Sequence, residues 1–92
     1  MELIDINDNN LAKTKKGRWL LLFWVPWGKP SFDQIELIKK NTQKARRIAL
    51  INVEENRDIA MDYDICLYPT MIFLNSGIEE HREIGLYGGS IK

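Results

Sequence analysis

The stretch Phe23-Trp24-Val25-Pro26-Trp27-Gly28-Lys29-Pro30-Ser31 decides the fold of this chain, because an apolar run ends there and a helical pattern begins. Residues 19–25 are all apolar and show no alternation with polar residues. That pattern is typical of a central strand covered on both faces. The sequence therefore predicts a sheet with a layer of helices on each side.

The residues after this strand predict a turn and then a long amphipathic helix. Pro26 to Pro30 form the turn, and Ser31 and Gln34 have the spacing of a capping box. Apolar residues then recur on one helical face to about Arg46. We therefore expect Ser31 to cap the helix.

The rest of the chain alternates short apolar runs with helical patterns. Strands are expected at 3–6, 48–53, 70–74 and 78–86, and short helices at about 10–15 and 54–64. The crossover between the strands at 19–25 and 48–53 favours a right-handed parallel unit, and Asn75-Ser76-Gly77 predicts a hairpin turn. The order β-α-β-α-β-α-β-β predicts one α/β domain over residues 1–92, with a mixed central sheet.

Composition limits the partners. The 92 residues carry 13 basic and 13 acidic side chains, so no net charge steers the chain to nucleic acid or to a membrane. Two basic clusters are interpreted as helix ends and solvated faces: Lys13, Lys15, Lys16 and Arg18, and Lys39, Lys40, Lys44, Arg46 and Arg47. We expect neither nucleic acid nor membrane as a partner. The amino terminus lacks a basic signal-like start, so the cytoplasm is the expected location.

The deciding stretch resembles the active-site strand and loop of the thioredoxin family, in which an aromatic strand runs into Trp-x-x-Pro-x at the start of a long helix. Further agreement in order and spacing comes from Asn52-Val53-Glu54-Glu55-Asn56, Tyr68-Pro69-Thr70, and Asn75-Ser76-Gly77 followed by Gly85. The resemblance covers nearly the whole chain and implies a thioredoxin-like fold. It also implies a cis peptide bond before Pro69.

The family's dithiol is absent from the matching positions. Gly28 stands at the nucleophile position and Ser31 at the resolving position, with Pro30 retained and Lys29 where the family usually has glycine. A glycine has no nucleophile, and a serine hydroxyl does not replace a thiolate in disulfide exchange. This loop therefore predicts no dithiol enzyme activity.

A second departure concerns the family's buried aspartate and lysine, which serve proton transfer. Their positions hold Leu22 and Leu50. Because an isolated buried charge is costly, an apolar pair is the natural filling once proton transfer is not needed. The two replacements argue against a chain in which only the cysteines were changed.

The resemblance implies that a peptide groove remains, at Trp27, Tyr68, Pro69, Ile84 and Gly85. Main-chain pairing with an extended peptide needs no thiol. The prediction is a redox-inactive thioredoxin-like module that binds protein or peptide, with no cofactor. The alternative is a redox-related protein, which either uses its single cysteine, Cys66, or is a cysteine-less variant of an active thioredoxin.

Two further expectations concern metal binding and assembly. Glu79, His81 and Glu83 share one face of the last expected strand, and we interpret them as a solvated edge, with no metal site. The sequence ends at Lys92, roughly where the family's final amphipathic helix would begin, so we expect that helix to be absent or truncated. The resulting uncovered sheet face predicts a homodimer.

Overall fold

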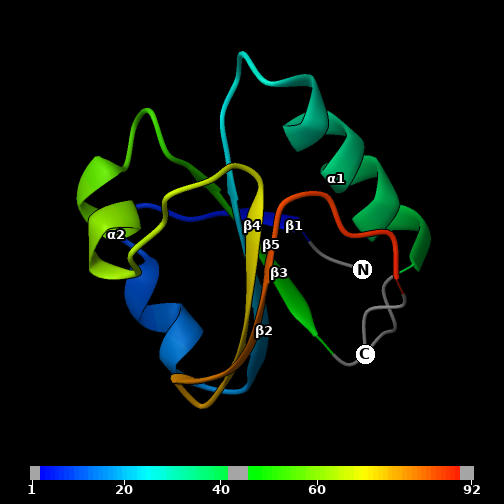
Figure 1. Cartoon of the computed structure of the whole chain (residues 1–92). Helices are drawn as coiled ribbons and strands as arrows, with labels where there is room; N and C mark the ends of the chain where they lie inside the picture. The colour runs from blue at the N-terminus through cyan, green and yellow to red at the C-terminus, as the bar shows by residue number, and fades with distance from the viewer. Residues whose placement is uncertain (1–2, 42–45, 90–92) are drawn as a thin grey trace.

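A mixed five-stranded sheet with helices on both faces forms the protein in the computed structural model, which describes residues 3–41 and 46–89 (Figure 1). In chain order the elements are β1 (Leu3–Asp5), η1 (Leu11–Lys15, a 3₁₀ helix), β2 (Arg18–Trp24), α1 (Lys29–Asn41), β3 (Arg47–Asn52), α2 (Arg57–Asp62), β4 (Thr70–Asn75) and β5 (Ile78–Ile84). The strands lie in the order β1-β3-β2-β4-β5. Within the described residues, no helix is long and apolar enough to cross a membrane.

The central strand is β2, which lies parallel to β3 and antiparallel to β4. Its residues Trp19 to Phe23 are fully buried. A strand with neighbours on both edges and helices over both faces keeps its central side chains away from water, which explains the unbroken apolar run.

The two faces of the sheet have separate cores. On one face, Leu21 and Phe23 pack with Ile59 of α2 and Leu11 of η1. On the other face, Leu20 and Leu22 pack with Ile38 of α1. Figure 1 shows α1 on one side of the edge-on sheet, and α2 and η1 on the other.

The hairpin between β4 and β5 turns through Ser76 and Gly77, at φ 52° and 83°. Positive φ at both central residues is the geometry that lets a two-residue turn follow the twist of the strands. The expected hairpin is therefore present, with the turn where the sequence predicts it.

A register shift between Phe73 and Leu74 corrects the prediction for the outer strand β5. Phe73 pairs with His81, whereas Leu74 pairs with Glu79, so one residue of β5 is extra. Glu79 and His81 therefore lie on opposite faces: Glu79 pairs with Arg82, and His81 contacts Glu83. The expected common face is therefore wrong for Glu79, because the extra residue reverses the alternation, whereas His81 and Glu83 lie opposite Phe73 and Met71 and share one face.

The start of α1 corrects the role given to Ser31. The helix begins at Lys29, so Ser31 lies in the first turn and is not the cap. Its hydroxyl oxygen accepts a hydrogen bond from the Val25 backbone N–H at 3.1 Å. The last helical residue is Asn41, and the expected continuation over 42–45 lies outside the described residues.

The sequence predicts Arg46 on a solvated face, and this prediction is wrong. The residue is buried, with an exposed fraction of 8%. Its guanidinium donates to the backbone oxygens of Trp19 and Leu74 at 3.1 and 3.2 Å, and lies 5.0 Å above the Phe73 ring centre. Burial lowers the pKa of Arg46, and the nearby Arg18 cation lowers it further. Glu80 opposes this shift through a 3.5 Å ion pair.

The sheet face packed against α1 is not left bare. Leu20, Leu22, Met71 and Phe73 are all buried on it. Arg46 lies over Phe73, while Tyr87, beyond β5, packs on the same core. The expected uncovered face is therefore wrong for the described residues, and a homodimer through it stays a prediction without that support.

Candidate functional site

Trp27 and Tyr68 come together at a surface groove of about 310 Å³. Trp27 lies in the turn between β2 and α1 and is 67% exposed; Tyr68 lies in the loop before β4 and is 39% exposed. The groove is lined by Val25, Trp27, Val53, Glu54, Arg57, Ala60, Met61, Ile65 and Tyr68. Large exposed apolar side chains around a hollow are typical of a surface that binds protein.

The loop beside this groove has backbone groups that are available for hydrogen bonding. The Tyr68–Pro69 peptide bond is cis. Within the described residues, the backbone N–H and C=O of Tyr68 have no hydrogen-bond partner. They are available to an extended peptide that adds to this edge.

The other expected groove residues lie next to this loop but do not line the groove. Pro69 is buried, and its carbonyl oxygen accepts a hydrogen bond from the Gly85 N–H at 2.8 Å. Ile84 pairs with Thr70 and is exposed. The structure therefore brings Trp27 and Tyr68 together at the groove, whereas Ile84 and Gly85 are not among the residues that line it.

The α2 side of the groove was missed from the sequence. Met61 is 75% exposed at the groove, and Arg57 lines it from the first turn of the same helix. The sequence did contain a signal for this side of the groove. Ile59 and Ala60 already supply the buried face of α2, so the apolar Met61 is not needed for the core. An exposed apolar side chain that shares a hollow with others, here with Trp27 and Tyr68, is typical of a binding surface.

The loop that carries the family's dithiol is occupied by side chains with structural roles. A β-carbon on Gly28 would lie 3.0 Å from Val25 Cγ2 and 3.7 Å from Ser31 Oγ, so Val25 narrows the space that a side chain would need. Ser31 is buried, and Lys29 pairs with Asp33 at 2.8 Å. Residues 27–31 contain no cysteine.

Leu22 and Leu50, which the resemblance predicts at the positions of a proton-transfer pair, form an apolar contact. Leu22 and Leu50 are register partners on β2 and β3, and both pack in the core beneath α1. An apolar pair leaves no buried charge to stabilise and no proton to exchange.

Cys66 is exposed in the loop between α2 and β4. Its Sγ lies 3.9 Å from the Asp64 carbonyl oxygen, a weak contact. It is two residues from Tyr68 but does not line the groove.

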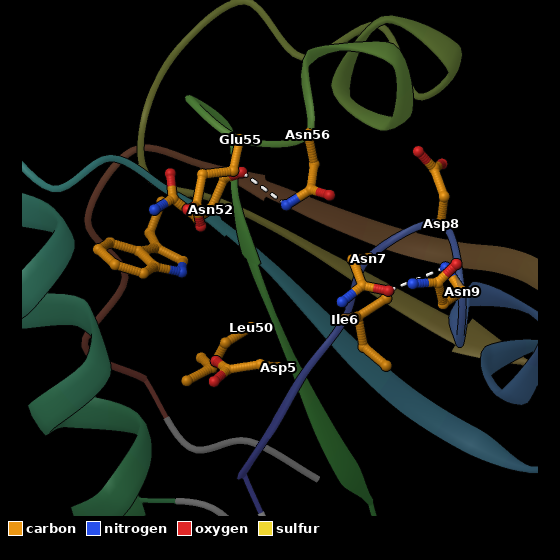
Figure 2. A pocket seen from close by; sticks show the side chains of 10 residues that line it. Asp5, Ile6, Asn7, Asp8, Asn9, Leu50, Asn52, Glu55 and Asn56 are labelled. Atoms are coloured by element: carbon orange, nitrogen blue, oxygen red, sulfur yellow. Dashed lines mark hydrogen bonds between the residues drawn. The ribbon is translucent and has the colours of Figure 1, made fainter.

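A second, polar hollow of about 720 Å³ lies where β1 and β3 end (Figure 2). Its side chains mostly hold their own turns: Asn7 accepts from the Asn9 N–H, Asn52 accepts from the Glu54 N–H, and Asn56 donates to the Asn52 carbonyl. The indole N–H of Trp24 is buried at this hollow without a partner among the described residues. No group of acidic, histidine or cysteine side chains suited to a metal is found in the described part of the chain.

The order of the strands, the helices on both faces and the Pro69 loop beside the start of α1 define a protein of the thioredoxin fold class. A sequence model described as Thioredoxin matches residues 4–90, nearly the whole chain. The chain belongs to the thioredoxin family.

Individual relatives and solved structures agree. A thioredoxin of Mycoplasma pneumoniae is 34% identical over 65 residues, which are 68% of this chain and 64% of that protein, so the chain matches slightly less than two thirds of its length. A thioredoxin of Bacillus subtilis is 27% identical over 89 residues, 92% of this chain and 86% of the relative. The crystal structure of Malassezia sympodialis thioredoxin superposes with a TM-score of 0.83 at 18% identity, covering 96% of this chain and 82% of that one. A mutant thioredoxin from Halobacterium salinarum gives 0.81 at 20% identity, over 94% and 80% of the two chains. The predicted thioredoxin-like fold is confirmed.

Proposed function

We propose that this protein is a peptide-binding module of the thioredoxin family that does not exchange disulfides through its α1 loop. The observation that carries the proposal is the pairing of two features. Gly28 and Ser31 stand where the family has thiols, whereas Trp27 and Tyr68 remain exposed around a groove. Recognition and thiol chemistry use different atoms, so one can persist without the other.

The groove favours an extended peptide with an apolar side chain beside a polar or charged one. Trp27 and Met61 supply apolar surface, and Tyr68 supplies unpaired main chain. Glu54 and Arg57 add one charge of each sign at the rim. Main-chain pairing gives affinity, and the pocket selects alternate side chains.

The first experiment measures reduction of insulin disulfides by dithiothreitol with and without the protein. We expect no acceleration over dithiothreitol alone, because the α1 loop holds no thiol. Acceleration that persists in a Cys66→Ser variant would contradict the proposal outright.

The binding half is tested by selecting a random peptide display library on the protein and measuring the selected peptides by fluorescence anisotropy. Trp27→Ala and Met61→Ala should each weaken binding by about tenfold, as loss of an exposed apolar anchor does. Lys39→Ala, on the outer side of α1, is the matched control and should leave binding unchanged. Selected peptides that bind Trp27→Ala as tightly as the native protein would place the site elsewhere.

A redox role through Cys66 is the second candidate. The relatives matched in sequence are named thioredoxins, and the single thiol is exposed. A mixed disulfide would form when the Cys66 thiolate attacks a substrate disulfide and releases the other sulfur as a thiolate. The same insulin assay distinguishes this candidate, because its activity would vanish in Cys66→Ser.

A further inference from the structure

A basic hollow of about 340 Å³ lies at the start of β2, at the end of the strand opposite the peptide groove. It is lined by Lys16, Gly17, Arg18, Trp19 and Arg47, three cations and no carboxylate among the described residues. Lys16 and Arg18 belong to one basic cluster of the sequence and Arg47 to the other. The fold brings the clusters together because Trp19 of β2 is the register partner of Arg47 on β3.

The fully buried Trp19 side chain fixes both sides of this hollow. Its Nε1–H donates to the Lys16 carbonyl oxygen at 2.9 Å, which holds the backbone of the turn before β2. Its ring lies 5.7 Å from the Arg47 guanidinium carbon. A guanidinium stacked on an aromatic face keeps its N–H groups free at the edge, because these donors lie in its own plane.

The electrostatic surroundings of Lys16 and Arg47 decide what this hollow can bind. Lys16 and Arg47 have no ion pair within the described residues, and Arg18 lies close enough to Arg46 to lower the pKa of that buried guanidinium. Glu80 pairs with Arg46, away from the lining of the hollow. The net charge of zero is therefore no guide to this hollow, because acidic residues gather elsewhere among the described residues, as where Asp8 meets Asp58 and Asp62.

We propose that Lys16, Arg18 and Arg47 form a binding site for phosphate groups. Two guanidinium groups and one ammonium suit an anion of more than one charge with several acceptor oxygens, and the planar guanidinium matches phosphate geometry with paired donors. A carboxylate carries a single charge and would use only part of this set. The phosphate comes either from a free polyphosphate or from the backbone of single-stranded nucleic acid, which present the same oxygens.

The test is a titration of the native protein, followed by ¹H–¹⁵N NMR, with tripolyphosphate, with a short oligothymidylate, and with acetate at matched ionic strength. We expect the phosphate-bearing probes to shift the Trp19 indole N–H and the Gly17 and Arg47 amides. Tighter binding of the oligothymidylate identifies nucleic acid as the source, whereas equal or tighter binding of tripolyphosphate identifies a free polyphosphate. Equal shifts with acetate, or shifts with no probe, would overturn the proposal.

Variants separate the site from general charge attraction. Lys16→Gln and Arg47→Gln should each weaken binding several-fold, and for the oligonucleotide each should reduce the slope of log affinity against log salt by about 0.7. Lys29→Gln removes the same charge at the opposite end of the sheet and should change neither value. Arg47→Lys keeps the charge without the paired donors, so binding as weak as in Arg47→Gln supports recognition by the guanidinium.

A misfolded variant would be recognised by its thermal unfolding and by loss of the dispersed NMR spectrum. Lys16→Gln keeps the test decisive if Arg47→Gln fails to fold. The Lys16 side chain is exposed and does not stack on the buried Trp19 ring, so its replacement should leave the fold intact. If Lys16→Gln and Arg47→Gln both fold and bind as well as Lys29→Gln does, the site is not the basic hollow.

Discussion

The Ser31 hydroxyl oxygen accepts a hydrogen bond from the Val25 backbone N–H at 3.1 Å, which joins the first turn of α1 to the residue that follows β2. Both residues are buried. Ser31 therefore holds the start of α1 against the end of β2 through a buried hydrogen bond.

Replacing Ser31 by alanine should destabilise the protein by about 1–3 kcal/mol, because the buried Val25 N–H loses its acceptor. Urea unfolding followed by circular dichroism measures the change. Lys29→Ala, an exposed change in the same turn, is the control and should cost less than about 1 kcal/mol. A Ser31→Ala variant as stable as the control would mean that this hydrogen bond contributes little.

Gly28 and Val25 should be energetically coupled. A β-carbon at Gly28 meets Val25 Cγ2 at 3.0 Å, so Gly28→Ala requires Val25 to move. We expect Gly28→Ala to cost less in a Val25→Ala background than in the native protein, with a coupling energy of about 0.5–2 kcal/mol. A double-mutant cycle of unfolding free energies tests this, with Gly88→Ala, whose β-carbon would meet nothing within 4 Å, as control. Additive effects would contradict the close contact.

Substitutions of Arg46 should lower the free energy of unfolding more than most other single substitutions. Arg46→Met removes the donor to two buried backbone oxygens and the cation above Phe73, so a loss of about 2–4 kcal/mol is expected. Glu80→Gln removes only the 3.5 Å partner, whose side chain is 46% exposed, and should cost less than about 1 kcal/mol. Thermal unfolding of the two variants compares them, and similar losses would mean that the ion pair is the main contribution.

The Asp8 carboxyl should retain its proton above its ordinary pKa of 3.8. A hydrogen bond with the Asp58 carboxyl is the main cause of the raised pKa, and the charges of Asp58 and Asp62 add to it. Because the folded state binds this proton more tightly than the unfolded state, the stabilisation is complete below pH 3.8 and is lost as pH rises through the folded pKa.

An NMR titration of the carboxyl carbons measures this value directly. In Asp58→Asn, the pKa of Asp8 should fall toward 3.8, because the acidic partner is gone. Asp64→Asn, which changes an acid that is not a cause of the shift, is the control. An unchanged pKa in Asp58→Asn would remove Asp58 as the cause.

Much of the fold was predictable because its signals are local. The unbroken apolar run at 19–25 predicts a central strand, and the Asn75-Ser76-Gly77 turn predicts the hairpin; both are present. The groove was predictable in part, through Trp27 and Tyr68. Met61 was missed because the outer face of a short helix is normally solvated, and only the packing of α2 against β2 shows what it faces.

The errors have equally local causes. Capping-box spacing at Ser31 does not distinguish a cap from a residue inside the first turn, which depends on where the preceding loop lets the helix begin. Alternation along β5 fails at the extra residue opposite Phe73 and Leu74, which no composition signal marks. The cluster of cations around Arg46 predicts a solvated residue, and only the tertiary structure shows the two carbonyl oxygens that accept from its guanidinium.

By itself, the sequence determined the class of fold, the order of its elements and the absence of a thiol at positions 28 and 31, because these follow from residue type and from periodicity along the chain. The tertiary structure alone decided which side chains share a surface. Lys16 and Arg47 line one hollow because parallel pairing sets Trp19, near the start of β2, beside Arg47, the first residue of β3. Arg46 is buried because it donates to two strand carbonyls and lies over Phe73. Such contacts depend on strand register, which places residues far apart in the chain side by side. No local sequence pattern predicts that register.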